Sequence, residues 1–150
     1  MANHYQKILV AVDGSKAAEL AFKKAIGIAS RNQARLLLVH VIDTRTFSLV
    51  EAYGQGLVDR AAQNANELLD MYKQQARSAG IVDVDYIIEF GSPKLRIPKD
   101  IAQNNNIDLI ICGATGMNSV ERFLIGSVSE NITLHAPCDV LVVRTEKEFT

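Results

Sequence analysis

Five short apolar runs, separated by stretches with helical spacing, limit most strongly how this chain of 150 residues can fold. Each run is apolar nearly throughout instead of alternating with polar residues, which is typical of strands that are covered on both faces. Strands that alternate with helices along one chain predict an α/β fold with a doubly wound parallel sheet and a single domain. The five runs are Lys7–Val12, Arg35–Ile42, Val84–Phe90, Leu109–Cys112 and Asp139–Arg144.

The first two helices have clear start and stop signals. Ser15, in the turn after the first run, is the expected N-cap of a helix whose apolar stripe includes Ala18, Ala21, Phe22, Ala25, Ile28 and Ala29. The longest helix is expected from Leu57 to Ala79, and Gly80 follows in the position that favours a left-handed backbone. Its predicted buried stripe consists of Val58, Ala61, Ala65, Leu68, Tyr72 and Ala76. Residues 43–56 show no clear period, and we expect a loop or lid there.

A third helix is expected between Ser92 and Asn104, and it contains a defect. Ser92 is a suitable cap, and Pro93 occupies a first helical position that tolerates proline. Pro98 lies inside the same segment, where a proline removes an N–H donor and clashes with the preceding turn. We therefore expect irregular backbone between Pro93 and Pro98, or a regular helix that starts only near Pro98. A last helix is expected from Val128 to His135.

The order of the strands decides which loops lie together. Right-handed crossovers and short connections leave few topologies, and we expect the order 3-2-1-4-5 with helices on both faces of the sheet. In such sheets, ligands bind beyond the carboxyl ends of the strands where the order reverses. That point lies between the first and fourth strands. The turn 13–15 and the segment that begins at Cys112 and Gly113 should therefore face each other across one crevice.

A glycine pattern follows the fourth strand. Gly113 and Gly116 have two residues between them, nine more residues precede Gly126, and Ser127 comes next. Glycines let backbone N–H groups approach a ligand closely, and a helix that opens after Gly126 would offer unpaired N–H groups to a phosphate. We expect Gly126 to need a positive φ. The stretch is not a Walker A loop, because the chain contains no Gly-Lys-Ser/Thr sequence.

Two less specific interpretations of this stretch remain open. The three glycines could be turn residues that precede an ordinary helix cap. Ser127 and Glu130 also form the pattern of a capping box, with Ser127 as the N-cap, and this box could coexist with bound phosphate. Arg122 is the only cation in the stretch; it could reach a γ-phosphate or remain solvated.

Composition excludes several other classes of function. A net charge of −1 gives the chain no general attraction to nucleic acid or to anionic lipid. No apolar run approaches the roughly 18 residues of a membrane span, and residues 1–7 lack the apolar core of a signal peptide. Two cysteines are too few for a disulfide framework. We expect a cytoplasmic protein with reduced thiols.

The sequence resembles the universal stress proteins, and in particular their ATP-binding subgroup. The resemblance covers residues 7–145 and is strongest in the pattern Gly113-x2-Gly116-x9-Gly126-Ser127. The segments 8–15, 135–138 and 140–144 are also similar. The family implies a five-stranded α/β fold that is usually dimeric and binds ATP with Mg²⁺ or Mn²⁺. It also implies a homodimer in which the edge strand Val140–Arg144 pairs antiparallel with its copy.

The resemblance assigns a place to each site residue. Ala11, Val12, Asp13 and Ser15 would line the adenosine side, although many relatives have proline where Ala11 stands. Val41 would meet the adenine through its backbone, and Gly113 would lie against the ribose with the Cys112 backbone beside it. The phosphates would be held by Gly116, Gly126, Ser127, Val128 and Ser129. Asp13 could contact the ribose or a metal, or it could cap the first helix together with Ser15.

These assignments predict an ATP-binding protein that acts as a switch or sensor in a stress response, with little or no hydrolysis. The alternative from the enzyme class is a slow ATPase, for which Asp13 is the sole candidate base. A ligand-free interaction module would fit the same fold but would leave the glycine spacing unexplained. His40, which interrupts an apolar strand, is interpreted as a packed or edge histidine and not as a ligand.

Overall fold

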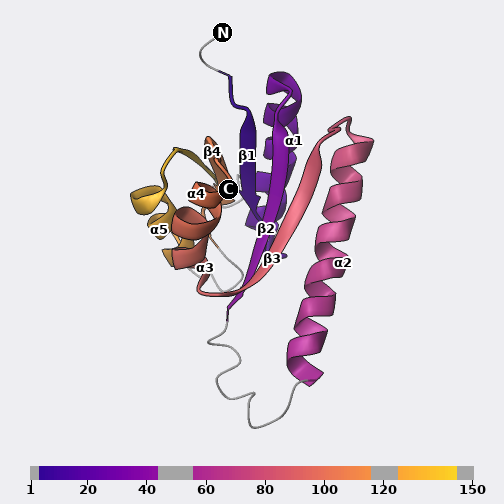
Figure 1. Cartoon of the computed structure of the whole chain (residues 1–150), viewed down its shortest axis with the longest axis vertical. Coiled ribbons are helices and arrows are strands. Elements are labelled where there is room, and N and C mark those ends of the chain that lie inside the picture. Colours follow the sequence, from indigo (N-terminus) through magenta and orange to yellow (C-terminus); the bar gives the residue numbers. More distant parts are fainter. Residues whose placement is uncertain (1–3, 44–55, 116–124, 145–150) are drawn as a thin grey trace, which may run out of the picture.

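The computed structural model describes residues 4–43, 56–115 and 125–144. In this part of the chain five strands form one sheet with the order β3-β2-β1-β4-β5 (Figure 1), and every neighbouring pair is parallel, as predicted. The elements are β1 (Lys7–Ala11), α1 (Lys16–Asn32), β2 (Arg35–Asp43), α2 (Gly56–Ser78), β3 (Val84–Gly91), α3 (Pro93–Leu95), η3 (Arg96–Ile101), α4 (Ala102–Asn104), β4 (Leu109–Gly113), α5 (Ser127–His135) and β5 (Asp139–Val143). Most of the predicted lid, Gly116 and Arg122 lie outside the described residues.

Helices cover both faces of the sheet, which confirms the doubly wound arrangement. α1 and α2 pack on one face, and the shorter elements α3, η3, α4 and α5 pack on the other (Figure 1). Successive strand residues point to opposite faces. Ile8 and Leu36 therefore enter the core under α1 and α2, whereas Leu9 and Val39 enter the core under α5 and η3. Both faces of the central strands are buried, which is why their sequences are continuous apolar runs.

Helix α1 begins where its cap predicts. The Ser15 hydroxyl accepts a hydrogen bond from the Ala18 N–H at 3.1 Å. Alanines fill most of the buried face, and they allow the helix axis to approach the sheet closely. The buried residues are Ala17, Ala18, Ala21, Phe22, Ala25 and Ala29. Ile28, which we expected in this stripe, is only half-buried.

Helix α2 ends as predicted but buries a slightly different stripe. Gly80 has a φ of +98°, and the Ile81 N–H donates to the Ala76 carbonyl at 3.0 Å, which closes the helix end. Ala65, Leu69, Tyr72 and Ala76 are buried. Leu69 takes the place that we expected for Leu68, and the more N-terminal residues of the predicted stripe remain half-buried. Two adjacent leucines satisfy the same spacing, so the sequence alone does not separate them.

The third helix is irregular, as predicted, and the irregularity has a specific form. After one α-helical turn from Pro93, the segment η3 is π-helical, and the Ala102 N–H donates to the Ile97 carbonyl five residues earlier. Pro98 is buried within η3. Because proline cannot donate the usual bond to the residue four positions earlier, a wider turn accommodates it. The π segment continues to Ile101, so the irregularity extends beyond the stretch 93–98 in which we expected it.

None of the helices in residues 4–43, 56–115 and 125–144 combines the length and the apolar character needed to cross a bilayer.

Candidate functional site

The candidate site lies at the carboxyl ends of β1 and β4, where the strand order reverses. β1 pairs with β2 on one side and with β4 on the other, and Val10 lies beside both Leu38 and Ile111. Continued in the same register, the chain brings Val12 next to Gly113. The β1–α1 turn and the segment after β4 therefore leave the sheet side by side, as the topology predicts.

The β1–α1 turn is held by a short series of contacts. The Ser15 N–H donates to Asp13 Oδ1 at 2.9 Å, and Gly14 between them has a φ of +84°. Only glycine adopts this φ without strain. Asp13 thus takes part in starting α1, as one of the two interpretations of this residue expects. The contact uses one carboxylate oxygen, so the second oxygen can still contact a ligand or an ion.

Gly113 is required by packing against α1. A Cβ at this position would lie 2.8 Å from the backbone carbonyl carbon of Ala17 and 2.8 Å from its Cβ. These distances are far inside van der Waals contact, so α1 can approach the end of β4 only because position 113 has no side chain. The sequence suggested ligand access as the reason for this glycine, and the structure adds a reason that concerns the fold.

Helix α5 begins differently from our expectation. Gly126 is the N-cap residue, and Ser127 is already the first helical residue, so the predicted capping box with Ser127 as N-cap is wrong. The Gly126 backbone has φ −65° and ψ 159°, a region that any residue adopts, so the predicted positive φ is also wrong. The Glu130 N–H donates to the Gly126 carbonyl at 2.9 Å.

The start of α5 leaves three backbone donors for a ligand. In an α-helix the N–H groups of the first turn have no acceptor within the helix, and here they belong to Ser127, Val128 and Ser129. The positive end of the helix dipole is at the same place. All three residues were predicted to hold phosphates. Their backbone N–H groups have the right chemistry for that role.

Backbone hydrogen bonds join the residue after β4 to the N-cap residue of α5 and to β5. The Gly126 N–H donates to the Ala114 carbonyl at 2.7 Å, and the Ala114 N–H donates to the Val143 carbonyl at 2.8 Å. The Gly126 N–H is therefore engaged inside the protein. Gly126 itself adds no side chain at the helix start.

Ser129 anchors α5 to the sheet. Its side chain is buried, and its hydroxyl donates to the Gly113 carbonyl. The hydroxyl is therefore part of the packing between α5 and β4, and the Ser129 backbone N–H is the group that faces the helix start. Sequence spacing did not distinguish the hydroxyl from the amide.

Of the two cysteines, Cys112 is buried and Cys138 is half-buried. Burial raises the pKa of the Cys112 thiol to about 11, against an opposing hydrogen bond with Ser129. Burial and the nearby carboxylates of Asp108 and Asp139 raise the pKa of Cys138 to about 11. Both thiols are thus protonated at neutral pH, and a protonated thiol is a poor nucleophile.

His40 makes a contact that the sequence did not reveal. Its Nδ1 lies 2.7 Å from the Val12 carbonyl oxygen, 28 residues earlier in the chain. The pattern showed only a polar residue within an apolar strand. Pairing of β2 with β1 places it beside the first residue of the candidate crevice.

Two further predicted site residues, Val41 and Ala11, would meet a ligand through their main chain more than through their side chains. Val41 is buried among residues under α5 and η3, so a ligand beyond the end of β2 would meet its main chain. Ala11 is half-buried at the end of β1.

Among residues 4–43, 56–115 and 125–144, no group of three or more His, Cys, Asp or Glu side chains could hold a metal ion.

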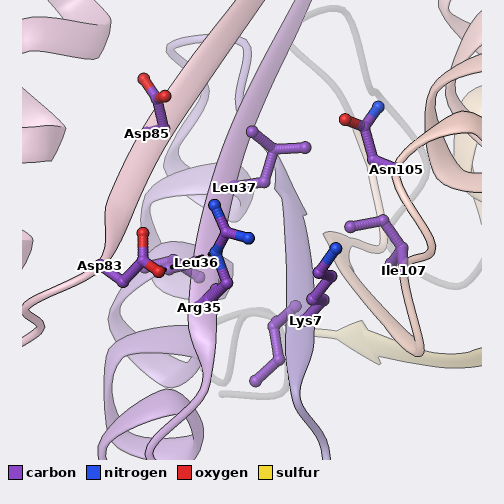
Figure 2. A pocket seen from close by; sticks show the side chains of 9 residues that line it. Lys7, Arg35, Leu36, Leu37, Asp83, Asp85, Asn105 and Ile107 are labelled. Carbon is purple, nitrogen blue, oxygen red and sulfur yellow. Dashed lines mark ion pairs between the residues drawn. The ribbon is translucent and has the colours of Figure 1, made fainter.

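A hollow lies at the end of the sheet opposite the candidate site. It is a shallow cavity at the amino ends of β1 and β2, with Lys7, Arg35 and Asn105 on its walls (Figure 2). Arg35 Nε is 2.7 Å from Asp83 Oδ2, and both side chains are more than half exposed. Charges of both signs in open solvent give this cavity little selectivity for a ligand.

Comparison with known proteins gives a consistent result. A family model described as "Universal stress protein family" matches residues 4–144. A Staphylococcus aureus (strain USA300) protein whose name places it in that family is 54% identical over 143 residues, which are 95% of this chain and 86% of the relative. The structure of universal stress protein UspA from Lactobacillus plantarum is 36% identical, covers 94% of this chain and 99% of its own, and superimposes with a TM-score of 0.85.

Two more distant structures share the fold and have names that state a bound ligand. One is a universal stress protein in complex with cAMP, 24% identical, with a TM-score of 0.69 over 95% of this chain and 98% of its own. The other is the Archaeoglobus fulgidus universal stress protein in complex with dAMP, also 24% identical, with a TM-score of 0.69 over 93% of this chain and 98% of its own.

Proposed function

Because this chain belongs to the universal stress protein family, we propose that its carboxyl-edge crevice binds an adenine nucleotide, with ATP and Mg²⁺ or Mn²⁺ as the preferred ligand. Occupancy by the nucleotide would set the conformation of the protein or its choice of partner. One observation carries the proposal: the unpaired N–H groups at the start of α5 lie at the switch point, next to the β1–α1 turn.

The phosphate side of the proposal rests on backbone donors. The N–H groups of Ser127, Val128 and Ser129 converge at the positive end of the α5 dipole. Gly126, the N-cap residue, adds no side chain in front of them. The stretch 113–127 contains no lysine, so most of the negative charge of a triphosphate must be balanced by these N–H groups and by a divalent cation.

The adenosine side of the proposal uses the ends of β1 and β2. Val12 and Asp13 begin the turn beside Gly113, and the Val41 main chain lies at the end of the neighbouring strand. Backbone groups at a strand end can pair with the edge of an adenine ring. The free oxygen of Asp13 would accept a ribose hydroxyl or, through water, contact the cation.

The adenine part of the ligand has support from related proteins, and the triphosphate part rests on the glycine pattern. The two nucleotide complexes of the same fold hold cAMP and dAMP. A single phosphate group can accept all three helix N–H groups, so the preference for a longer phosphate chain rests on the divalent cation that such a chain would carry. We expect affinity to increase from AMP to ATP when Mg²⁺ is present.

Hydrolysis is expected to be slow. A hydrolase needs a base within hydrogen-bond reach of the attacking water. Among the described residues of the crevice, Asp13 is the only carboxylate, and one of its oxygens is engaged by Ser15. Turnover should therefore fall well below the roughly 1 s⁻¹ of an ordinary enzyme.

Calorimetric titration with ATP and Mg²⁺ tests the proposed site. Gly126→Val should weaken binding at least tenfold, about 1.4 kcal/mol, because the added side chain occupies the phosphate approach. Since the φ of Gly126 suits valine, this loss would not reflect backbone strain. Gly56→Val is the matched control, because Gly56 also begins a helix and has open space around it.

The outcomes of this titration are distinct. Equal affinity for ATP in Gly126→Val and the unmutated protein would remove the start of α5 from the site. Phosphate release at several per second that Asp13→Ala abolishes would make the enzyme interpretation correct. Absence of measurable binding to ATP, ADP and AMP would leave the ligand-free interaction module.

We also propose that the protein forms a homodimer through its edge strand β5. β5 is an edge strand that pairs only with β4 in the described sheet, and its four valine and leucine residues are half-buried. An apolar edge strand invites pairing with another strand, and a second copy is the simplest partner. Val142→Pro, which removes a backbone donor, should shift the protein towards monomer in light scattering. A monomer for the unmutated protein at micromolar concentration would contradict the proposal.

A further inference from the structure

We propose that His40 is a positioning residue of the nucleotide site, and that it holds the Val12 carbonyl so that the β1–α1 turn faces the start of α5. The inference rests on the proposed function, because it names the residue that shapes one wall of the same crevice. It is carried by the 2.7 Å contact between His40 Nδ1 and the Val12 oxygen.

The contact lies where regular pairing between β1 and β2 stops. Register between these strands ends with Ala11 opposite Val39, and the Val12 N–H still donates to the Val39 carbonyl at 2.9 Å. β1 then turns away towards Gly14, whereas β2 continues to Asp43 beside β3. The His40 side chain reaches from the continuing strand to the departing one and binds the next carbonyl.

The result is that both backbone polar groups of one residue, Val12, are held. The N–H of Val12 is bound by the backbone of β2, and its carbonyl is bound by a side chain of the same strand. Asp13 follows directly, and it is joined to Ser15 and so to the start of α1. Displacement of the Val12 carbonyl would therefore move the Asp13 carboxylate and change the width of the crevice.

One strand thereby sets two parts of the proposed site. Val41, whose main chain is proposed to meet the adenine, follows His40 directly in β2. A rigid link from His40 to Val12 fixes the distance between the adenine end and the Asp13 end of the crevice. Without it, the two ends would be related only by the ladder that stops at Ala11 and by the hydrogen bond from the Val12 N–H to the Val39 carbonyl.

The chemistry of the contact fixes the ring tautomer. A carbonyl oxygen only accepts, so the ring nitrogen must donate, and the neutral imidazole must carry its proton on Nδ1. Neutral histidine in water favours the other tautomer, with the proton on Nε2. Nitrogen-15 NMR of the ring distinguishes the two forms in the unmutated protein without any ligand.

Substitutions at position 40 separate the hydrogen bond from the bulk of the ring. His40→Leu keeps an apolar side chain of comparable size but removes the donor. His40→Asn restores a donor at the δ position, where Nδ2 can replace Nδ1. Calorimetry with ATP and Mg²⁺ should show affinity five- to tenfold weaker for His40→Leu and within about twofold of the unmutated protein for His40→Asn.

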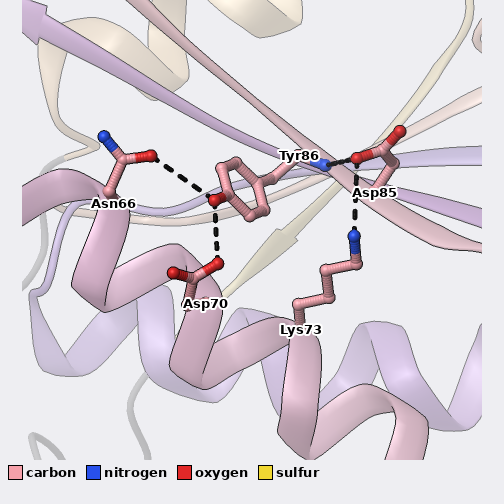
Figure 3. Close-up of polar contacts among 5 residues, drawn as sticks. All are labelled: Asn66, Asp70, Lys73, Asp85 and Tyr86. Atoms are coloured by element: carbon pink, nitrogen blue, oxygen red, sulfur yellow. Dashed lines mark hydrogen bonds and ion pairs between the residues drawn. The ribbon is translucent and has the colours of Figure 1, made fainter.

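Tyr86→Phe is a matched control on the same face of the sheet. The Tyr86 hydroxyl donates to Asp70 at 2.8 Å and joins β3 to α2, where Lys73 also contacts Asp85 (Figure 3). The variant loses a side-chain hydrogen bond of similar length on the edge strand away from β1. Its nucleotide affinity should not change, even if its melting temperature falls.

Each outcome judges the inference separately from the proposed function. Equal ATP affinity in the His40→Leu and unmutated proteins overturns it, and so does a weakening that His40→Asn does not relieve. A ring protonated only on Nε2 also overturns it, and this measurement remains decisive if His40→Leu does not fold. If the unmutated protein binds no nucleotide, the proposed function fails, and the inference fails with it even where the Nδ1 tautomer is found.

Discussion

The two ends of the sheet are built differently. At the amino end, side chains bind the starts of the strands: Asp108 accepts the N–H groups of Gln6 at 2.8 Å and Lys7 at 3.1 Å. The Tyr5 hydroxyl donates to Asp139 at 2.7 Å, which ties the beginning of the chain to β5. At the carboxyl end, the start of α5 keeps its backbone N–H groups without partners in the helix. At the amino end, these polar groups bind one another within the protein. At the carboxyl end, the first N–H groups of α5 remain available to a ligand.

This difference assigns separate tasks to the two ends. Polar groups that are satisfied within the protein add to stability but cannot bind a ligand, whereas unpaired donors cost some stability and are available for binding. Changes at the amino end should therefore lower the free energy of unfolding and leave nucleotide affinity unchanged. Changes at the carboxyl end should have the opposite pattern, with one exception.

Gly113→Val is that exception, and it should have the largest effect on stability. Although Gly113 lies at the carboxyl end, its Cβ would meet the Ala17 backbone at 2.8 Å. Because backbone atoms cannot give way as a flexible side chain can, we expect a loss of about 3 kcal/mol or more in the free energy of unfolding. Urea denaturation measures it. A loss below about 1 kcal/mol would mean that α1 moves away at little cost.

Asp108→Ala should have the next largest effect. It leaves the N–H groups of Gln6 and Lys7 without their acceptor, and we expect about 2 kcal/mol less stability by urea denaturation. Asp108→Asn keeps one acceptor oxygen and should lose about half as much. Affinity for ATP should stay the same in both variants, and a tenfold change in either would contradict the separation of tasks.

Cys112 should make stability fall in alkaline solution. Burial raises its pKa to about 11 in the folded protein, from the ordinary 9.0 of a free thiol. The folded state therefore holds this proton more tightly, so the stabilisation is complete below pH 9 and is lost as pH rises towards 11. Since one pKa unit is worth roughly 1.4 kcal/mol, we expect a loss of about 2 kcal/mol between pH 9 and 11, measured as the difference in pH dependence between the unmutated protein and Cys112→Ala. Identical curves between pH 9 and 11 would show that the thiol titrates normally.

Asp83→Asn at the amino end should have the smallest effect. The ion pair between Arg35 and Asp83 is short, at 2.7 Å, but the two side chains are 60% and 55% exposed. Exposed pairs contribute little because water and salt screen them, and we expect less than about 1 kcal/mol. Thermal unfolding at low and high salt measures the change. A larger loss would show that the cavity of Figure 2 is more shielded than its exposure indicates.

The strand pattern predicted the fold almost completely. Continuous apolar runs gave all five strands to within about one residue at each end, because a strand covered on both faces admits few polar residues. The π-helical form of η3 was not predictable, since Pro98 shows that an α-helix must be interrupted but not how. The choice between Leu68 and Leu69 also depended on how α2 packs on β3.

The site was predictable in its position but not in its hydrogen bonds. Topology brings the turn 13–15 to the end of β4, and this follows from strand order alone. The Gly126 N–H is engaged because Ala114 is itself held by Val143 in β5, a tertiary contact without a local signal. The His40 contact has the same character, since it joins residues 28 positions apart across two strands.

A chemical-shift titration with ATP and Mg²⁺, followed on backbone amides by NMR, tests the central claim most directly. The account predicts large changes at Ser127, Val128 and Ser129, with smaller changes at Val12 and Val41. The amides of Gln6 and Lys7 at the amino end should stay unchanged. Saturable shifts confined to the amino end, or no shifts at millimolar ATP, would contradict the assignment of the carboxyl end as a nucleotide site.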